Sequence, residues 1–283
     1  HQTSFNGASD AFLVKFNSAG TRQWGTYYGG SNDDIGNSCA TDASGNVYLA
    51  GETNSTSAIS SGGHQSSPGG AIDAFLVKFL ALTGVRQWGT YYGGLADDFG
   101  YSCATDASGN VYLSGKTNSI GSISSGGAQQ TTKGALHDGF LAKFNSAGTR
   151  LWGTYYGGAL EDWGNSCATD PSGNVYLAGQ TRSSVGIYSG GHQPSLGGSV
   201  DAFLVKFNSA GNRQWGTYYG GSSNDDNGNS CATDANGNVY LAGETNSISS
   251  ISSGGHQSSP GGSGSMDAFL VKFNSAGTRL WGT

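Results

Sequence analysis

The chain is built from one sequence unit that returns about every 64 residues. Four cysteines mark this period, because each lies 64 residues after the one before it: Cys39, Cys103, Cys167 and Cys231. The tripeptide Trp-Gly-Thr marks it again, beginning at Trp24, Trp88, Trp152, Trp215 and Trp281. The unit is present four times, with an extra partial copy. Such a period is typical of arrays in which each unit is one supersecondary module that buries its apolar surface against its neighbours.

Within one unit the residue pattern predicts four strands and no helix. We name the strands a, b, c and d; in the first full unit they are expected at residues 37–41, 46–52, 74–79 and 87–92. Strand b alternates Val47 and Leu49 with Tyr48 and Ala50, which is the period of a strand. The a–b and c–d links, residues 42–46 and 17–21, carry the Asp, Asn and Gly residues of tight hairpin turns. Four antiparallel strands repeated in this way are the sequence signature of propeller blades.

The sizes of the side chains predict the order of the strands within a module. Strand a carries small residues, whereas strand d carries Trp88, Tyr91 and Tyr92. Because sheets arranged around an axis crowd near it and spread outward, strand a is expected to be innermost and strand d outermost. The aromatic strand d is then the outer wall of each module. The alternative is that it forms a platform on which sugars stack.

Three motifs resemble a known family. They are Asp-Ala-Phe-Leu-Val-Lys-Phe-Asn-Ser-Ala-Gly at 10–20, Trp-Gly-Thr-Tyr-Tyr-Gly-Gly at 24–30, and Cys-Ala-Thr-Asp-Ala-Ser-Gly-Asn-Val-Tyr-Leu-Ala-Gly at 39–51. Together they are similar to the bacterial SBBP-type β-propeller repeat of secreted and cell-surface proteins, and the resemblance covers essentially the whole chain. It implies an all-β, propeller-like array of four-stranded antiparallel blades and an extracellular or cell-surface location in bacteria. It leaves the function open, because a fold does not determine a function.

The repeat predicts where each module begins and ends. A half blade with the outer two strands is expected at residues 1–30, and full blades at 31–94, 95–158, 159–221 and 222–283, the last with a truncated strand d. Together they are expected to form one repeat domain. Since the order of strands begins with c and d and ends on d, the strands do not pair up into a closed ring. This pattern suggests either a piece of a longer array or a chain that is completed by another copy of itself. We expect copies of the chain to cover the open strand edges of one another, which gives a filament or another extended homopolymer.

Composition excludes several classes of function. The 13 Lys and Arg residues are outnumbered by 19 Asp and Glu residues, so no basic surface for nucleic acid is expected. No apolar run is long enough to span a membrane as a helix. No nucleophile–base pair and no phosphate-binding loop is recognisable, so the protein is predicted not to be an enzyme.

Acidic residues precede strand a in every unit and are the candidate metal ligands. Next to glycine and asparagine they are suited to calcium, which prefers carboxylate and carbonyl oxygens. The alternative is a turn in which the Asp side chains accept backbone hydrogen bonds. The candidates are Asp34, Asp98, Asp162 and Asp226, and no other cofactor is expected. The aspartates of the a–b turn are predicted to cap that turn instead: Asp42, Asp106, Asp170 and Asp234.

The single cysteines and the strand c lysines have structural interpretations. No Cys-x-x-Cys pair is present, which disfavours a zinc site, so each cysteine is expected to be a small buried apolar residue, with disulfides left open. The lysines are expected to extend their charges to solvent and to discourage edge-to-edge aggregation: Lys15, Lys78, Lys143, Lys206 and Lys272.

The b–c loop, roughly residues 53–72, is long and rich in Ser, Gly, Thr and Asn. Long loops in compact domains are often functional. The loops carry His64, His192 and His256, but Ala128 replaces the histidine in the second unit, which argues against a shared ring of metal-binding histidines. The alternatives are a surface loop without a function and a loop that binds glycans or neighbouring chains. The sequence therefore favours a secreted structural or adhesive protein, and a multivalent carbohydrate-binding propeller is the alternative.

Overall fold

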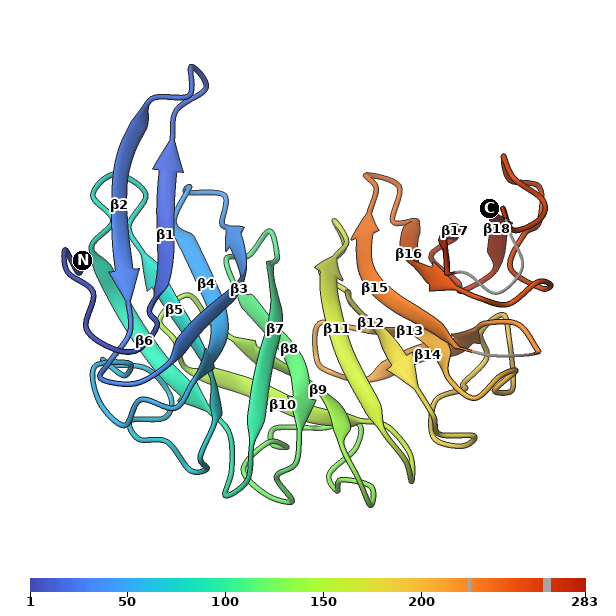
Figure 1. The fold of residues 1–283 in the computed structure, drawn as a ribbon, viewed down its shortest axis with the longest axis horizontal. Helices are drawn as coiled ribbons and strands as arrows, with labels where there is room; N and C mark the ends of the chain where they lie inside the picture. Colours follow the sequence, from blue (N-terminus) through green and yellow to red (C-terminus); the bar gives the residue numbers. More distant parts are fainter. Residues whose placement is uncertain (223–224, 262–265) are drawn as a thin grey trace. The chain divides into compact units, whose positions relative to one another are not determined.

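The computed structural model describes residues 1–222, 225–261 and 266–283 (Figure 1). Throughout these ranges the regular structure consists of strands, and no helix long and apolar enough to cross a membrane is found there. The strands are β1 Ala11–Phe16, β2 Arg22–Tyr28, β3 Asp34–Thr41, β4 Val47–Thr53, β5 Asp73–Phe79, β6 Arg86–Tyr92, β7 Asp98–Thr105, β8 Val111–Thr117, β9 Asp138–Phe144, β10 Arg150–Tyr156, β11 Asp162–Thr169, β12 Val175–Thr181, β13 Asp201–Phe207, β14 Arg213–Tyr219, β15 Asp226–Thr233, β16 Val239–Thr245, β17 Asp267–Phe273 and β18 Arg279–Gly282.

The strands form four antiparallel sheets of four strands and one hairpin of two. The four-stranded sheets are β3-β4-β5-β6, β10-β9-β8-β7, β11-β12-β13-β14 and β15-β16-β17-β18, and β1 pairs with β2. Each sheet therefore holds strands a, b, c and d in chain order. This confirms the all-β fold class, with four blades of about 64 residues and a partial blade in a propeller-like array.

The chain divides into two compact units, which we describe separately. The first contains residues 1–123 and 142–151, and the second contains residues 124–141 and 152–283. This division falls inside the module expected at 95–158. The module boundaries taken from the repeat remain a prediction, and the sheets above are the structural description of the modules.

Turn chemistry sets the hairpins, as the sequence predicts. In the a–b turn, the Asp42 carboxylate accepts hydrogen bonds from the backbone N–H of Ser44 and Asn46, at 3.0 and 2.9 Å. Gly45 lies in the left-handed region with a φ of 76°, where a β-carbon would be strained. The c–d turn of the first hairpin places Gly20 at the same φ. The turn role predicted for Asp42 is therefore confirmed.

Each strand c has two faces, and both carry apolar side chains. In β1 one face presents Ala11, Leu13 and Lys15, and we call it the Leu face; the other presents Phe12, Val14 and Phe16, and we call it the Phe face. In the first of the two compact units, the Leu face of β1 packs in one core with the Phe face of β5. Ala11 and Leu13 lie against Phe75, Val77 and Phe79. The equivalent core of the second unit joins Ala202 and Leu204 of β13 to Phe269, Val271 and Phe273 of β17.

The cysteines lie on strand a and are not joined by disulfides. Cys103, Cys167 and Cys231 are buried, as expected for small core residues. The Cys103 sulfur lies 3.7 Å from the Ser38 carbonyl oxygen on the strand a of the preceding module. Cys39 is exposed because the hairpin before it contributes only β1 and β2, without a strand a to cover it.

Candidate functional site

The junction between consecutive modules is held by a tryptophan from strand d. The Trp88 indole Nε1–H donates to the Ser146 carbonyl oxygen in the c–d turn of the next module, at 3.0 Å. Gly148 of that turn has a φ of 83° and lies flat on the indole, so that a β-carbon there would be 2.7 Å from Trp88 Cδ2. The same pairing recurs as Trp24 with Ala81, Trp152 with Ser209 and Trp215 with Ser275. We call this contact the tryptophan latch.

Three of the four latch tryptophans are interior residues, and Trp24 is partly buried. Trp88, Trp152 and Trp215 are buried, which supports the outer-wall interpretation of strand d over a sugar-stacking platform. The glycine of the c–d turn has a second role that the sequence did not reveal. It provides the flat backbone surface against which the indole of the preceding module packs.

The strand c lysines complete the junction, and the prediction of solvent-directed charges is wrong for three of them. Lys78, Lys143 and Lys206 are buried. The Lys78 ammonium lies 3.5 Å from Asp42 Oδ2 and 5.2 Å from the centre of the Tyr48 ring, and it donates to the Ser146 carbonyl oxygen at 3.2 Å. The reason is that strand c is an internal strand whose Leu face is covered by the next module, so the charge is paired inside the protein.

The lysine changes the electrostatics of the a–b turn. Burial opposes ionisation of Asp42, but hydrogen bonds from Asn46 and the charge of Lys78 outweigh it and lower the pKa of the carboxyl. The turn aspartate therefore caps its own hairpin and also binds the cation that contacts the next module. The same ion pair is found between Lys143 and Asp106 and between Lys206 and Asp170, at 3.4 and 3.5 Å.

Each candidate calcium ligand is the first residue of strand a and does not lie in the turn before it. Asp34 is the first residue of β3, three positions before the expected start, and it is buried. Its carboxylate accepts hydrogen bonds from Gly30 N at 2.7 Å, from Ser55 Oγ at 2.9 Å and from the Thr53 hydroxyl. Burial raises the pKa of Asp34 despite these donors. Asp98, Asp162 and Asp226 take the same position in β7, β11 and β15.

No group of three or more His, Cys, Asp and Glu residues that could hold a metal ion is found in the ranges that the structure describes. Calcium at Asp34, Asp98, Asp162 and Asp226 stays a prediction. The structure adds that the protein's own donors already bind both carboxylate oxygens of Asp34, Asp162 and Asp226.

A second aspartate, at the start of strand c, faces each of these positions and was missed by the sequence interpretation. A β-carbon on Gly93 would lie 2.0 Å from Asp73 Oδ1 and 2.6 Å from Asp98 Oδ2, so both carboxylates point at one glycine. Both are buried. Burial, reinforced by the charge of Asp98, raises the pKa of Asp73 to about 6. The equivalent Asp138, beside Asp162, has its pKa raised by burial to about 7.

A polar hollow of about 460 Å³ lies in the first unit, between the b–c loops of two successive modules. We call it the loop groove. Its walls include His64, Ser66 and Pro68 from one loop, Leu95 from the segment after β6, and Ser122 and Arg150 from the next module. The Arg150 guanidinium lies over the Tyr92 ring and donates through Nη1 to the Ser122 carbonyl oxygen at 2.6 Å.

Hydrogen bonds correct the assignment of Ala128 as the residue that replaces the loop histidine. Gln65, which follows His64, donates its backbone N–H to Thr90 Oγ1 at 2.7 Å. In the next module Gln130 makes the same bond to Thr154 Oγ1 at 2.9 Å. The residue equivalent to His64 is therefore Gln129, and the loop before it is longer by one residue. An alignment on the Gly-Gly pair before the histidine cannot detect this shift.

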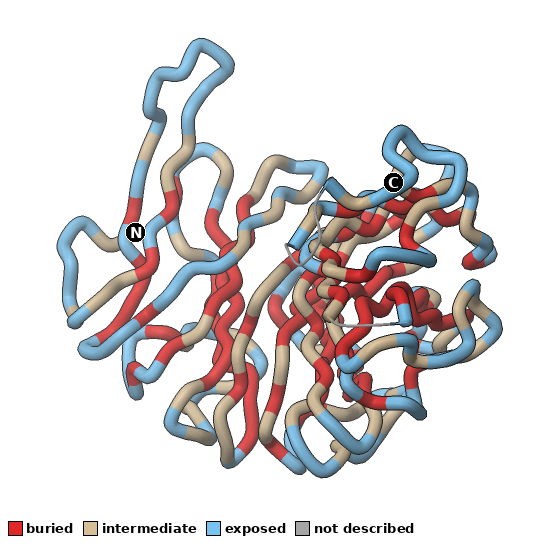
Figure 2. Tube along the Cα trace, turned by 45° about the vertical axis from the view of Figure 1, so that its right-hand side comes forward, coloured by how far each residue is buried: buried red, intermediate tan, exposed pale blue. Residues whose placement is uncertain are grey.

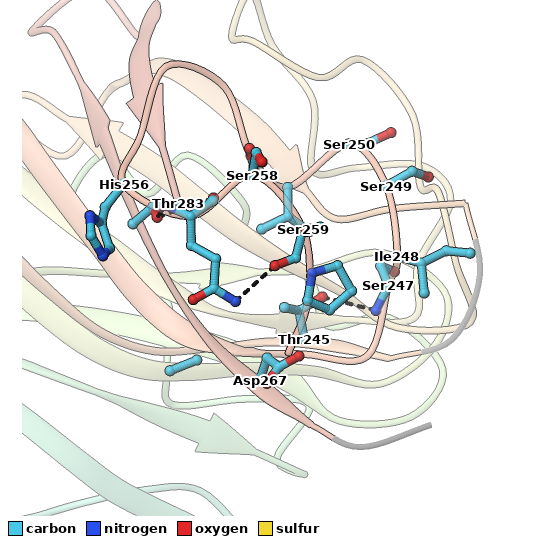
Figure 3. A pocket seen from close by; sticks show the side chains of 15 residues that line it. Thr245, Ser247, Ile248, Ser249, Ser250, His256, Ser258, Ser259, Asp267 and Thr283 are labelled. Atoms are coloured by element: carbon cyan, nitrogen blue, oxygen red, sulfur yellow. Dashed lines mark hydrogen bonds between the residues drawn. The ribbon is translucent and has the colours of Figure 1, made fainter. Parts of the chain in front are cut away.

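The loop histidine of the last module, His256, lines a different cavity, which has a volume of about 270 Å³ (Figure 3). Thr245, Ser247 and Thr283 also line it. At the equivalent place in the first full module lies Tyr91, whose hydroxyl donates to the Ser55 carbonyl oxygen at 2.9 Å. In the first full module a tyrosine side chain thus fills the space that corresponds to this cavity. We therefore regard the cavity as a place for a side chain of the module and as a poor candidate for a ligand site.

The family comparison agrees with this geometry. The model of the SBBP β-propeller repeat matches residues 23–57, 87–121, 151–185 and 214–248. The chain belongs to the SBBP β-propeller repeat family. Each matched segment starts at strand d of one module and runs through strands a and b of the next, so every SBBP repeat includes a junction with its latch tryptophan.

A curated relative shares the repeat character of this SBBP chain. It is an uncharacterized WD repeat-containing protein of Acanthamoeba polyphaga mimivirus, 23% identical over 96% of this chain. The chain spans 24% of the length of that relative.

Proposed function

We propose that this SBBP-repeat protein is a non-enzymatic structural or adhesive protein outside a bacterial cell, where copies join end to end into a filament or surface layer. The observation that carries the proposal is the Phe face of β1. Phe12 and Phe16 are 69% and 58% exposed, whereas their equivalents in β5, Phe75 and Phe79, are fully buried by the preceding module. Burying a phenylalanine contributes about 1.5–3 kcal/mol, so this face gains from a partner.

The opposite face of the last module is the complementary surface. Leu270 is 37% exposed, whereas its equivalent Leu204 is fully buried. Within the chain, the Leu face of one module packs on the Phe face of the next module. The exposed Leu face of the last module could therefore pack on the exposed Phe face of β1 in another copy. A head-to-tail contact of this kind is heterologous and extends copy by copy. The edge of β1 that is not paired with β2 adds backbone groups for pairing between chains. The far end of this hairpin is exposed (Figure 2). The extracellular location rests on the resemblance to repeats of secreted proteins.

The test is light scattering and electron microscopy of the 283-residue polypeptide over a range of concentrations. The proposal predicts ordered polymers, and it predicts that Phe12→Ser combined with Phe16→Ser leaves single particles. Leu82→Ser is the matched control, because Leu82 is 89% exposed in a c–d turn and lies on neither face. Single particles of the unsubstituted chain at every concentration would contradict the proposal.

Carbohydrate binding is the second candidate, and the loop groove is the observation that favours it. The groove is concave and polar, and it has the volume of a small-ligand site. Binding to a glycan array that is lost on substitution in the loops, and kept on substitution of Phe12 and Phe16, supports this function. Binding that is kept on substitution in the loops and lost on substitution of Phe12 and Phe16 excludes carbohydrate binding by the loop groove.

A further inference from the structure

We propose that the loop groove binds a sugar that carries a carboxylate, and that the site recurs at the junctions where a loop histidine faces an arginine of the next module. The inference rests on the carbohydrate-binding candidate above and names its ligand class. It is independent of end-to-end assembly, because the groove lies between two modules of the same chain.

Arg150 is the group that would recognise the carboxylate. Its bonds to the Ser122 and Ile123 carbonyl oxygens, at 2.6 and 3.4 Å, run through Nη1 alone. The Tyr92 ring, 5.9 Å from the guanidinium carbon, supports the group from one side. The other nitrogens of a guanidinium form the planar pair of donors that suits a carboxylate. An arginine fixed in this way loses little freedom when a ligand binds.

His64 and the loop serines supply partners for hydroxyl groups. Burial, and after it the charge of Arg150, lowers the pKa of His64, so the imidazole is neutral at neutral pH. A neutral imidazole both donates and accepts a hydrogen bond, as a sugar hydroxyl does. The Ser66 and Ser67 side chains are exposed along the same wall, and Pro68 and Leu95 offer apolar surface for the C–H face of a sugar ring.

The backbone at the groove is strained in each module that follows a histidine. Outside glycine, positive φ values in the described ranges occur at Ala58, Ser122 and Ser250, between 70° and 73°. Each of the three offers its carbonyl oxygen to the strand d arginine of its own module: Arg86, Arg150 and Arg279. Non-glycine residues held in this region cost energy and gather at functional sites.

The strain and the histidine occur together. The rings of His1, His64 and His192 lie 6.2–6.3 Å from a phenylalanine of the next module, and these next modules hold the three strained residues. At the remaining junction Gln129 stands in place of the histidine. There the arginine, Arg213, is held by Gly186, whose φ of 93° costs a glycine little. Three junctions thus share one arrangement, and the fourth lacks both features.

Repetition along the chain points to a polymeric ligand. Weak equivalent sites on one chain sum into avidity when the ligand carries the same group at intervals. An acidic polysaccharide, with one carboxylate on each sugar, meets this condition. The net charge of -6 makes general attraction of a polyanion unfavourable, so binding depends on the local arginines.

The experiment is a ¹H–¹⁵N NMR titration with tetragalacturonate, in which the arginine Nε–H signals report each groove separately. We expect the signals of Arg86, Arg150 and Arg279 to shift, and those of Arg22 and Arg213 to stay. Arg22 is the matched control, since it starts strand d of the hairpin that lacks a b–c loop. The methyl ester of the same tetramer should bind roughly tenfold or more weakly, because it has no charge to pair with the guanidinium.

Two substitutions test the histidine in opposite directions. Gln129→His should make the Arg213 signal shift, and His64→Gln should abolish the shift of Arg150, with the thermal unfolding curve of each variant unchanged. Equal shifts with the acid and the ester keep carbohydrate binding and overturn the carboxylate assignment. Shifts with neither ligand overturn both, and an equal shift at Arg22 overturns the site.

Discussion

The tryptophan latch predicts that Gly148→Ala destabilises the chain far more than the same substitution at a matched glycine. Gly148 and Gly109 lie in one module, in the c–d and a–b turns, with φ values of 83° and 78°. A β-carbon on Gly109 would meet nothing within 4 Å, whereas one on Gly148 would lie 2.7 Å from Trp88 Cδ2. The two substitutions therefore carry the same backbone penalty and differ only in the contact with the indole.

The magnitudes follow from the geometry. The left-handed conformation costs an alanine about 1–2 kcal/mol at either position, partly offset by the smaller entropy of the unfolded chain. At Gly148 the turn or the indole must move by roughly 1 Å, an overpacking that costs about 1–3 kcal/mol. The bond from Trp88 Nε1 to the Ser146 carbonyl oxygen adds about 1 kcal/mol if it breaks. We expect Gly148→Ala to cost about 2–4 kcal/mol more than Gly109→Ala.

The assay is urea unfolding followed by tryptophan fluorescence and circular dichroism, with the slopes of the transitions compared to confirm that both variants unfold the same structure. Equal losses of stability in the two variants, within about 0.5 kcal/mol, would refute the latch as a contact between modules.

Three further predictions concern buried groups. The free energy of unfolding should fall as the pH rises from about 4 to about 7, because the raised pKa values of Asp73 (about 6) and Asp138 (about 7) keep protons on the folded chain that the unfolded chain has released. Urea midpoints measured at several pH values should show this fall. Asp73→Asn should make the dependence of stability on pH less steep, although the lowered pKa of His64 acts in the opposite direction. Lys78→Met should lower the free energy of unfolding by about 3 kcal/mol, because Asp42 loses its buried partner. The double variant Lys78→Met with Asp42→Asn should recover part of that loss in the same urea assay. If the single and the double variant lose the same stability, the ion pair is excluded. Iodoacetamide should modify Cys39 in the folded protein and reach Cys103, Cys167 and Cys231 only after unfolding, which mass spectrometry of the peptides measures; uniform labelling would contradict the packing of strand a.

The repeat and the turns could be predicted from the sequence because they depend on local chemistry. Asp42 and Gly45 determine the a–b hairpin from within five residues, and the alternation of strand b is a property of one strand. The sequence predicts that strand a begins at Asn37, three residues too late, because Asp34 is polar and suggests a turn. Its burial depends on the Thr53 and Ser55 hydroxyls, which are contributed from about 20 residues away in the chain.

The junction chemistry could not be predicted because it joins residues of different modules. Nothing near Lys78 in the sequence indicates that Asp42 and Ser146, 36 and 68 positions away, will enclose its charge. The pairing of Asp73 with Asp98 across Gly93 is equally non-local. One signal was available: every full copy keeps the lysine, the turn aspartate and the tryptophan together, which suits a shared contact better than three independent surface residues.

The most direct test of the packing of the modules is hydrogen exchange of the indole N–H groups, followed by NMR. Trp24, Trp88, Trp152 and Trp215 each donate to a carbonyl oxygen of the following module, so their indole protons should exchange slowly. Trp281 takes the same strand d position in the last module, and its proton should exchange fast in dilute single particles and slowly once copies assemble. Fast exchange at the first four tryptophans, or slow exchange at Trp281 in single particles, would contradict the account.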